Sequence, residues 1–235
     1  MKNKIALITG ATSGIGKASA ITLAKMGYDI IATGRRKDRL DELEQEIPAG
    51  IRFLPLVFDV RDREKVGEIL GNLPADWTAV DVLINNAGFF MPGQIQNEED
   101  GVLERQIEAN LYSAYHLTRA VLPTLQAQKS GHIFTICSTA SITAYTAGGS
   151  YCISKFALLG FTKVLREETK LQGIKVTAIL PGATLTPAWD GVELPESRFI
   201  PADDVASTIY SAYTMNPSTV LEEILIRPQL GDIEL

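Results

Sequence analysis

Tyr151 and Lys155 are the pair of residues whose types and spacing point most directly to chemistry. They stand four residues apart, so a helical segment places the phenol and the ammonium on one face. A phenol keeps its proton up to about pH 10, and a neighbouring cation lowers that pKa. The spacing therefore predicts a tyrosine that exchanges a proton near neutral pH. The same spacing also fits an ordinary surface or half-buried pair, so the rest of the chain has to decide.

A glycine-rich stretch near the N-terminus predicts a phosphate-binding turn. Residues 4–9 form an apolar run typical of a buried parallel strand, and residues 15–26 have helical apolar spacing. Gly10, Gly14 and Gly16 lie at this junction, where glycines allow close approach to a pyrophosphate and the helix N-terminus offers free N–H groups. The spacing G-x-x-x-G-x-G differs from the commoner G-x-G-x-x-G. Its place between a strand and a helix favours a dinucleotide site over a plain turn.

The composition argues against several classes of protein. The 235 residues are 46% apolar and 21% charged, with a formal net charge of −6. This balance disfavours nucleic acid and anionic membranes as partners, and no apolar stretch approaches the roughly 20 residues of a membrane span. Cys137 and Cys152 form no C-x-x-C pair and His116 and His132 stand far apart, so neither a metal site nor a disulfide is expected. We expect a cytoplasmic protein.

Strand and helix patterns alternate along the chain. Strands are expected near residues 4–9, 29–33, 52–58, 81–86, 132–138, 174–180 and 222–227, and helices near 15–26, 37–46, 62–71, 98–108, 110–127, 150–171 and 202–214. The strand segments are apolar almost throughout, which suits a parallel sheet covered on both faces. The prediction is one α/β domain, residues 1–235. It is a doubly wound parallel sheet (Rossmann) of about seven strands with helices on both faces, and it has a short substrate loop near 184–200.

Residues suited to ligand binding stand where the expected strands end. Besides the glycine turn, they are Gly34 and Arg35, Asp59, Asn85 to Gly88, Ser138, and Pro181 with Gly182. In an open parallel sheet, ligands bind outside the carboxyl ends of the strands. We therefore expect these segments to form one site.

Taken together, these motifs carry a family resemblance that covers essentially the whole chain. They are Thr9-Gly10-x-x-x-Gly14-Ile15-Gly16, Asp59-Val60, Asn85-Asn86-Ala87-Gly88, Asn110, Ser138, Tyr151-x-x-x-Lys155 and Pro181-Gly182, with Ser138 thirteen residues before Tyr151. With them the chain resembles a short-chain dehydrogenase/reductase of the compact single-domain branch. Each motif is weak alone, but the set is specific.

The resemblance implies four catalytic residues. Tyr151 would be the general acid in carbonyl reduction and the base in alcohol oxidation, and Lys155 would lower its pKa and bind the nicotinamide ribose. Ser138 would orient the substrate oxygen, and Asn110 would hold a water that links Lys155 to solvent. The alternatives are structural roles, in which Ser138 caps the next turn and Asn110 caps the helix that it opens.

The resemblance also implies a set of cofactor contacts. In that reading Asp59 touches the adenine, and Asn85 to Gly88 line the adenosine ribose and support the central sheet. The full set comprises Tyr151 and Lys155 together with Gly10, Ser13, Gly14, Ile15, Gly16, Arg35, Arg36, Asp59, Val60, Asn85, Ala87, Gly88, Pro181, Gly182, Thr184 and Thr186.

The end of the second strand favours NADP(H) over NAD(H). An acidic residue there would bond the ribose 2′-hydroxyl, whereas arginine accommodates a 2′-phosphate. Gly34 fills the place of the acid, and Arg35 and Arg36 follow. Some NADP-dependent members of the family carry a second basic residue where this chain has Ser13, which weakens the preference. The alternative for the two arginines is a solvated basic cluster at a helix start.

The implied function is an oxidoreductase that transfers a hydride between a nicotinamide cofactor and a small carbonyl or alcohol. Two other classes stay open: an NADP-binding regulatory or scaffold protein with little turnover, and a non-redox lyase such as a halohydrin dehalogenase. The lyase fits less well, because that class lacks the nucleotide loop and has Arg where Lys155 stands. The expected apolar lining comprises Phe89, Phe90, Met91, Tyr145 and Trp189.

Self-association is expected through two helices, 110–127 and 150–171. In the family they pair with those of a partner, and here they carry many apolar residues, among them Leu111, Tyr115, Leu122, Phe156, Leu159 and Leu165. A homotetramer or a homodimer is predicted. The alternative is that both helices face only their own sheet.

Overall fold

Seven parallel strands form one sheet in the order β3-β2-β1-β4-β5-β6-β7 in the computed structural model, which describes residues 3–233. The strands are β1 Ile5–Ile8, β2 Asp29–Gly34, β3 Phe53–Val57, β4 Val80–Asn85, β5 Gly131–Ile136, β6 Ile174–Pro181 and β7 Glu223–Ile226. The predicted doubly wound parallel sheet is confirmed.

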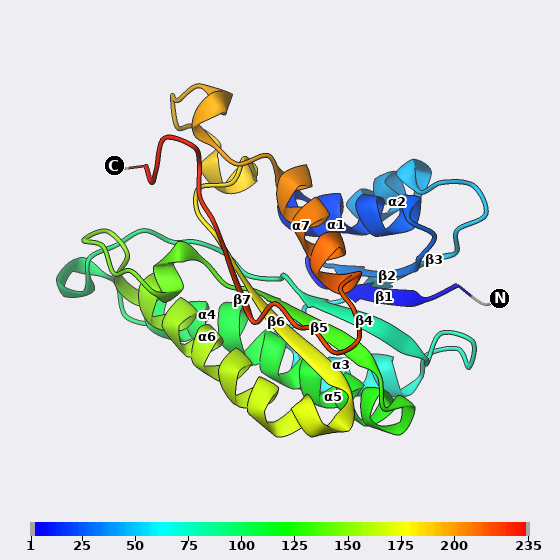
Figure 1. The fold of residues 1–235 in the computed structure, drawn as a ribbon. Coiled ribbons are helices and arrows are strands. Elements are labelled where there is room, and N and C mark those ends of the chain that lie inside the picture. The colour runs from blue at the N-terminus through cyan, green and yellow to red at the C-terminus, as the bar shows by residue number, and fades with distance from the viewer. Residues whose placement is uncertain (1–2, 234–235) are drawn as a thin grey trace.

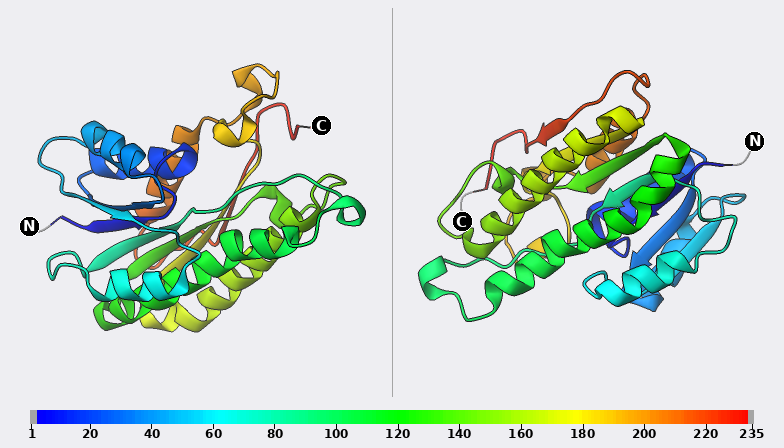
Figure 2. Two further views of the ribbon diagram at one scale, coloured as in Figure 1. Left: turned by 180° about the vertical axis from the view of Figure 1, so that it is seen from behind. Right: turned by 90° about the horizontal axis from the view of Figure 1, so that it is seen from below.

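Helices cover both faces of this sheet (Figure 1). One face carries α1 Gly14–Lys25, α2 Lys37–Glu46 and α7 Ala202–Tyr213, and the other carries α3 Arg63–Gly71, α4 Val102–Ile107, α5 Ser113–Gln128 and α6 Gly149–Thr169. The view from below shows α5 and α6 side by side across the sheet (Figure 2). No helix within residues 3–233 has the length and apolarity to cross a membrane.

The packing of the sheet explains its apolar strands. β1 and β2 are buried along their whole lengths because α1, α2 and α7 pack on one face while α3 and α5 pack on the other. Strands enclosed in this way need apolar side chains on both faces. β7 at the sheet edge alternates exposed and half-buried residues, as an edge strand with one free side does.

The region between β4 and β5 differs from the sequence prediction. The predicted helix 98–108 begins only at Val102, after a 3₁₀ turn at Ile95–Asn97. The predicted break before residue 110 is wrong, because a π-helical turn, Glu108–Tyr112, joins α4 to α5 without interruption. Asn110 therefore lies inside a helix and opens none. Single π turns of this kind often occur at functional sites.

The order of the strands reverses at β1, because the chain runs outward to β2 and β3 and then returns to β4 on the other side of β1. Its neighbours are β2 on one side and β4 on the other, both parallel to it. The glycine turn follows β1 directly, so it lies where the strand order reverses. Ligands of doubly wound sheets bind at such a switch point.

Candidate active site

The glycine turn after β1 is packed so tightly that side chains are excluded. Gly10 and Gly14 have φ of +62° and +52°, a conformation that glycine adopts without strain. A Cβ on Gly16 would lie 2.4 Å from both the Asn86 side chain and the Gly10 carbonyl oxygen. Ser13 sits at the N-terminus of the 12-residue helix α1. The turn thus leaves backbone N–H groups at a helix start, a fit for the pyrophosphate of a dinucleotide.

Asn86 and Thr9 hold this turn against the end of β4. The Thr9 hydroxyl accepts hydrogen bonds from the backbone N–H groups of Asn86 and Ala87, both 2.9 Å long. The Asn86 amide donates to the carbonyl oxygens of Thr9 and Gly10. The residue-by-residue set of predicted contacts omitted Thr9 and Asn86, although both belong to the motifs quoted above and Asn86 lies in the segment 85–88 that was expected to line the adenosine ribose. Side chains alternate in direction along a strand, so Asn86 was expected to point away from Asn85, and this was the signal that could have singled it out.

Asn85 points the other way. Its amide donates to the Thr118 hydroxyl on α5, 2.8 Å away, on the sheet face opposite α1. Successive side chains of a strand point to opposite faces, so Asn85 supports the sheet while Asn86 faces the glycine turn. The Asn85 side chain thus points away from the glycine turn and cannot make the predicted cofactor contact on that side of the sheet.

The end of β2 has no room for an acidic side chain. A Cβ on Gly34 would lie 2.5 Å from the Thr12 methyl group of the glycine turn. Arg35 and Arg36 follow and are exposed. Asp59, after β3, pairs with Arg61 at 2.6 Å, and this pairing lowers the pKa of the Asp59 carboxyl, with a smaller contribution from Arg35. The sheet thus brings Arg35 and Asp59 to one corner, as their positions at neighbouring strand ends required.

Ser138 and Tyr151 come together beyond β5. The Ser138 hydroxyl accepts a hydrogen bond from the Ala140 N–H, 3.1 Å away, and Ser141 bonds back to the Ser138 backbone. The capping role considered for Ser138 is therefore real. The Ser138 side chain also lies close enough to the Tyr151 phenol to oppose the rise in the Tyr151 pKa. Capping fixes the serine and does not compete with its placement beside the tyrosine.

Lys155 is buried beneath the same corner. Its Nζ donates to the carbonyl oxygen of Ile136, at the end of β5, over 2.8 Å. Burial lowers the pKa of the Lys155 ammonium to about 8. The same desolvation raises the pKa of Tyr151 to about 12. The predicted lowering of the Tyr151 pKa by Lys155 is wrong, because desolvation is the largest influence on this phenol and raises its pKa.

Asn110 ties three elements together from the π-helical turn. Its amide nitrogen donates to Ser154 at 2.9 Å and to the Phe89 carbonyl at 3.1 Å, and its oxygen accepts from the Phe89 N–H at 2.9 Å. Ser154 in turn donates to the carbonyl oxygen of Tyr151. A Cβ on Gly88 would lie 2.5 Å from the Asn110 oxygen. Asn110 thus anchors α6 near Tyr151, while its predicted water beside Lys155 stays a prediction.

The loop 184–200 lies beyond the carboxyl end of β6, between β6 and α7 (Figure 1). Its ends are joined by hydrogen bonds between Leu185 and Ile200 and between Ile200 and Ala183. A Cβ on Gly14 would lie 2.8 Å from the Thr186 methyl group, so the loop reaches the glycine turn. Two predicted contacts from distant parts of the chain are thus adjacent. Thr184 is buried and donates to the carbonyl oxygen of Gly182.

Only part of the predicted apolar lining packs around Tyr151. Phe90 packs edge-on against the Tyr151 ring, with centroids 4.8 Å apart. The pKa of the Tyr145 phenol is raised, chiefly by burial and to a smaller extent by the neighbouring Tyr151. Trp189 instead packs against Phe199 within the loop 184–200.

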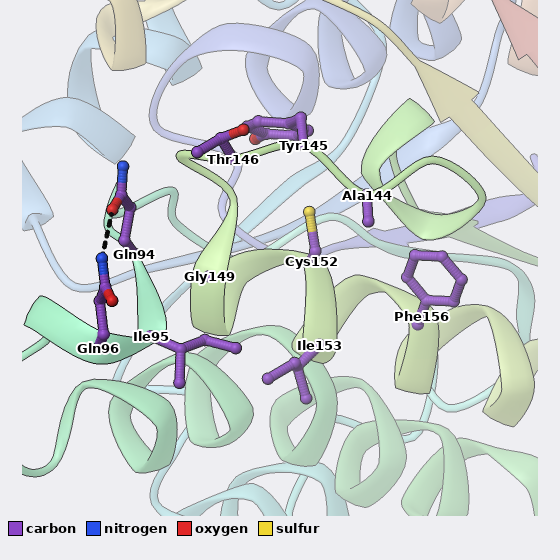
Figure 3. Close-up of a pocket in the computed structure, with 10 residues that line it drawn as sticks. All are labelled: Gln94, Ile95, Gln96, Ala144, Tyr145, Thr146, Gly149, Cys152, Ile153 and Phe156. Atoms are coloured by element: carbon purple, nitrogen blue, oxygen red, sulfur yellow. Dashed lines mark hydrogen bonds between the residues drawn. The ribbon is translucent and has the colours of Figure 1, made fainter.

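A groove of about 680 Å³ lies against the first two turns of α6 (Figure 3). We call it the outer groove; it is lined by Gln94, Ile95, Gln96, Ala144, Tyr145, Thr146, Gly149, Cys152, Ile153 and Phe156. Residues 149, 152, 153 and 156 share one helix face, which is opposite to that of 151 and 155. The groove is thus separate from the corner that holds Ser138 and Tyr151, although Tyr145 borders both.

The two histidines have surroundings of their own. His132 is buried, stacks on Phe134 and bonds Thr177 at 2.8 Å; burial lowers its pKa to about 3. His116 lies beside Tyr112 and Tyr115 on α5. Among residues 3–233, no three His, Cys, Asp or Glu side chains form a cluster that could hold a metal ion.

Comparison with protein families gives a match to the family described as short chain dehydrogenase over residues 4–196. The NADP-dependent 3-hydroxy acid dehydrogenase YdfG of Escherichia coli is 35% identical over 224 residues, which cover 94% of this chain and 87% of that protein.

Solved structures give the same picture. The closed form of serine dehydrogenase complexed with NADP+ has a TM-score of 0.87 and 28% identity, covering 97% of this chain and 96% of that one. L-sorbose reductase from Gluconobacter frateurii, complexed with NADPH and L-sorbose, has a TM-score of 0.87 and 27% identity, covering 97% and 96%.

Proposed function

Because the chain belongs to the short-chain dehydrogenase/reductase family, we propose that it reduces a small carbonyl compound with NADPH, with Tyr151 as the proton donor. Membership makes it an oxidoreductase that uses a nicotinamide cofactor and acts on hydroxyl or carbonyl groups. The proposal adds the residues, the cofactor preference and the substrate class. The observation that supports it is that Lys155 Nζ lies 5.8 Å from the centre of the Tyr151 ring and bonds the end of β5, with Ser138 close to the same phenol.

The dinucleotide would be held along the edge formed by the ends of β1, β2 and β4. Gly10, Gly14 and Gly16 allow the backbone to approach the pyrophosphate, and the start of α1 favours its charge. Residues 87 and 88, 181 and 182, and Thr186 of the loop 184–200 complete the cradle. When bound, the nicotinamide supplies the hydride.

Tyr151 and Ser138 supply the other half of the reaction. Reduction builds negative charge on the carbonyl oxygen, and donors aimed at that oxygen stabilise it. The Tyr151 phenol stays protonated through the neutral range because its pKa is raised to about 12, so it is a donor and not a phenolate. Lys155, whose ammonium has a pKa of about 8, holds its Nζ 5.8 Å from the centre of the Tyr151 ring.

The test is NADPH oxidation against a panel of carbonyl compounds. The panel contains 3-oxo acids, L-sorbose and simple ketones and aldehydes. The reverse reaction is followed as NADP+ reduction, with 3-hydroxy acids and serine as the substrates that are oxidised. These choices follow the activities that the relatives carry in their names. Tyr151→Phe should lower kcat by about 10²–10⁴-fold and leave the Kd for NADPH nearly unchanged.

The panel also separates the alternatives. A regulatory or scaffold protein would bind NADPH without oxidising it with any carbonyl compound, and a lyase would turn over without nicotinamide. Tyr151→Phe keeping more than about a tenth of the wild-type kcat would exclude Tyr151 as the donor.

The preference for NADP(H) rests on Gly34, Thr12 and Arg35. Thr12 occupies the space that an acidic side chain at Gly34 would need, and Arg35 is exposed at the same strand end. Arg35→Ala should weaken NADPH binding by about 1.5–3 kcal/mol, the scale of a charged hydrogen bond, and barely change NADH binding. Fluorescence titration with both cofactors measures this. Equal losses would show that Arg35 does not contact the 2′-phosphate.

We propose further that the protein is a homo-oligomer, a tetramer or a dimer, assembled through α5 and α6. Tyr115 on α5 packs against Phe161 on α6, so the two helices share one surface. Tyr112, in the π-helical turn that leads into α5, is more than 40% exposed, and so are Ile153, Phe156 and Val164 on α6. Soluble monomers seldom leave large apolar patches exposed. Leu159 and Leu165 were also expected at this interface, but they are buried in the core of their own chain.

A cytoplasmic location is part of the same proposal. Cys137 and Cys152 are both free and buried thiols, in keeping with a compartment where thiols stay reduced.

A further inference from the structure

The N-terminus of α6 is held by a carboxylate from a distant part of the chain. The Oε1 of Glu98 accepts a hydrogen bond of 2.9 Å from the Ser150 backbone N–H, and its Oε2 accepts one from the Ser150 hydroxyl. Ser150 is the second residue of α6, while Gly148, at the N-cap position, has no side chain that could cap the helix. Glu98 therefore caps the helix across 52 residues of sequence.

The surrounding backbone is shaped around this carboxylate. A Cβ on Gly149 would lie 2.1 Å from Oε1 of Glu98, and a Cβ on Gly93 would lie 2.9 Å from its Cγ. Gly93 also donates to the carbonyl oxygen of Ala147 over 2.9 Å and pairs with Gly148 in a β-bridge. Figure 3 shows neighbouring residues 94–96 beside the first turn of α6. The loop after β4 and the start of α6 thus form one joined unit.

This unit ends at the residue that the reaction depends on. Tyr151 follows Ser150 directly, and its phenol must meet both Ser138 and the substrate oxygen. Misplacing a reacting group by about 1 Å can cost about 10²-fold in rate. A carboxylate at a helix N-terminus is also favoured by the helix dipole, so the contact is stable where it is needed. Asn110 holds the same helix at Ser154, one turn later.

We propose that Glu98 is a positioning residue for the reaction, whose two hydrogen bonds to Ser150 fix the first turn of α6 and with it the Tyr151 phenol. The inference rests on the proposed role of Tyr151 as proton donor. It gives a function to the segment 93–98, in which the sequence showed no motif.

The experiment compares four variants of the full chain: Glu98→Ala, Glu98→Gln, Ser150→Ala and Glu99→Ala. Glu99 is an exposed neighbour and serves as the matched control. NADPH binding sites are counted by titration, and kcat is expressed per site well below the melting temperature of each variant. Loss of folded protein alone then leaves kcat per site unchanged.

We expect Glu98→Ala to lower kcat per site about tenfold and to change the Kd for NADPH by less than about twofold. Glu98→Gln keeps an oxygen acceptor for the Ser150 N–H and should recover most of the loss. Ser150→Ala keeps the backbone bond and should lose about threefold, which carries the test if Glu98→Ala does not fold. Glu99→Ala should match the wild type.

Wild-type kcat per site in Glu98→Ala, or in Ser150→Ala if the former cannot be prepared, would overturn the inference. So would equal losses in Glu98→Ala and Glu98→Gln, because the role would then be one of charge. Tyr151→Phe runs in the same assay. If it keeps its activity, the proposed function has failed; if it loses activity while Glu98→Ala does not, only the positioning role has failed.

Discussion

The two faces of α6 break the usual rule of burial in opposite directions. The inner face buries polar and ionisable groups: Lys155 is 6% exposed and Ser154 is fully buried, next to Tyr151. The outer face exposes apolar ones: Ile153, Phe156 and Val164 are 42%, 46% and 57% exposed. Charged side chains are almost never fully buried without a partner, and large exposed apolar patches mark contact sites.

The difference shows which parts of the helix serve its own fold and which do not. Leu158, Leu159 and Leu165 lie toward the sheet and the core and stabilise the chain in the ordinary way. On the inner face, burial of the Lys155 charge costs stability, as the lowered pKa of its ammonium shows, and on the outer face the exposed side chains bury little apolar area within their own chain. We infer that the inner face is kept for catalysis and the outer face for association.

Replacing the buried cation should separate catalysis from stability most strongly. Lys155→Met should lower kcat at least about 100-fold. The same change should raise the free energy of unfolding at pH 7 by roughly 1–3 kcal/mol, since the pKa shift of Lys155 measures the cost of burying its charge. Urea unfolding and the NADPH assay measure the two effects. Lys163→Met, an exposed lysine of the same helix, should change neither by much. A less stable Lys155→Met protein would contradict the account of the inner face.

The pH dependence of stability tests the same cost of burying the Lys155 charge. The folded pKa of Lys155 is about 8, below its ordinary value of 10.5. The unfolded chain therefore binds more protons between these values, so the contribution of Lys155 to stability rises with pH through that window. Urea unfolding between pH 7 and 9.5 should show this rise in the wild type. Its persistence in Lys155→Met would assign it to another group.

A charge on the outer face should split the assembly. Phe156→Glu would bury an unpaired carboxylate in the proposed interface, which is costly. Light scattering at micromolar concentration should give a multiple of 25.6 kDa for the wild type and about 25.6 kDa for the variant. Met26→Glu, an exposed apolar position at the end of α1 on the other side of the sheet, is the control and should keep the wild-type mass. A wild-type mass near 25.6 kDa would refute association outright.

The smallest predicted effect is that of Gly160→Ala, which should stabilise the monomer and weaken the assembly. Gly160 lies in the exposed stripe of α6, and a Cβ there would meet nothing within 4 Å in its own chain. In a bare helix, Gly160→Ala should add about 0.5–1 kcal/mol of stability. We expect that gain in the monomeric Phe156→Glu background and weaker association in the wild-type background, where a partner helix approaches. A gain in both backgrounds would place the interface elsewhere.

The sequence predicted the sheet and the main site because both rest on local patterns. Apolar runs and glycine spacing report the strands and the turn, and the spacing of Tyr151 and Lys155 follows from helix geometry alone. The seven parallel strands agree with the predicted segments to within a few residues. The error lay between residues 98 and 112, where an asparagine that reads as a helix cap lies inside a π-helical turn. Local propensity cannot foresee a side chain held by Phe89 and Ser154.

By itself the sequence determined the fold, the order of the strand-end motifs and the helical spacing that puts Tyr151 and Lys155 one turn apart. Only the tertiary structure decided their surroundings: the depth of burial that raises the pKa of Tyr151, the opposite directions of Asn85 and Asn86, and the reach of Glu98 to Ser150. The physical reason is range. Periodicity along the chain fixes which face a residue occupies, whereas desolvation and hydrogen bonds across dozens of residues depend on which elements the packed sheet brings together.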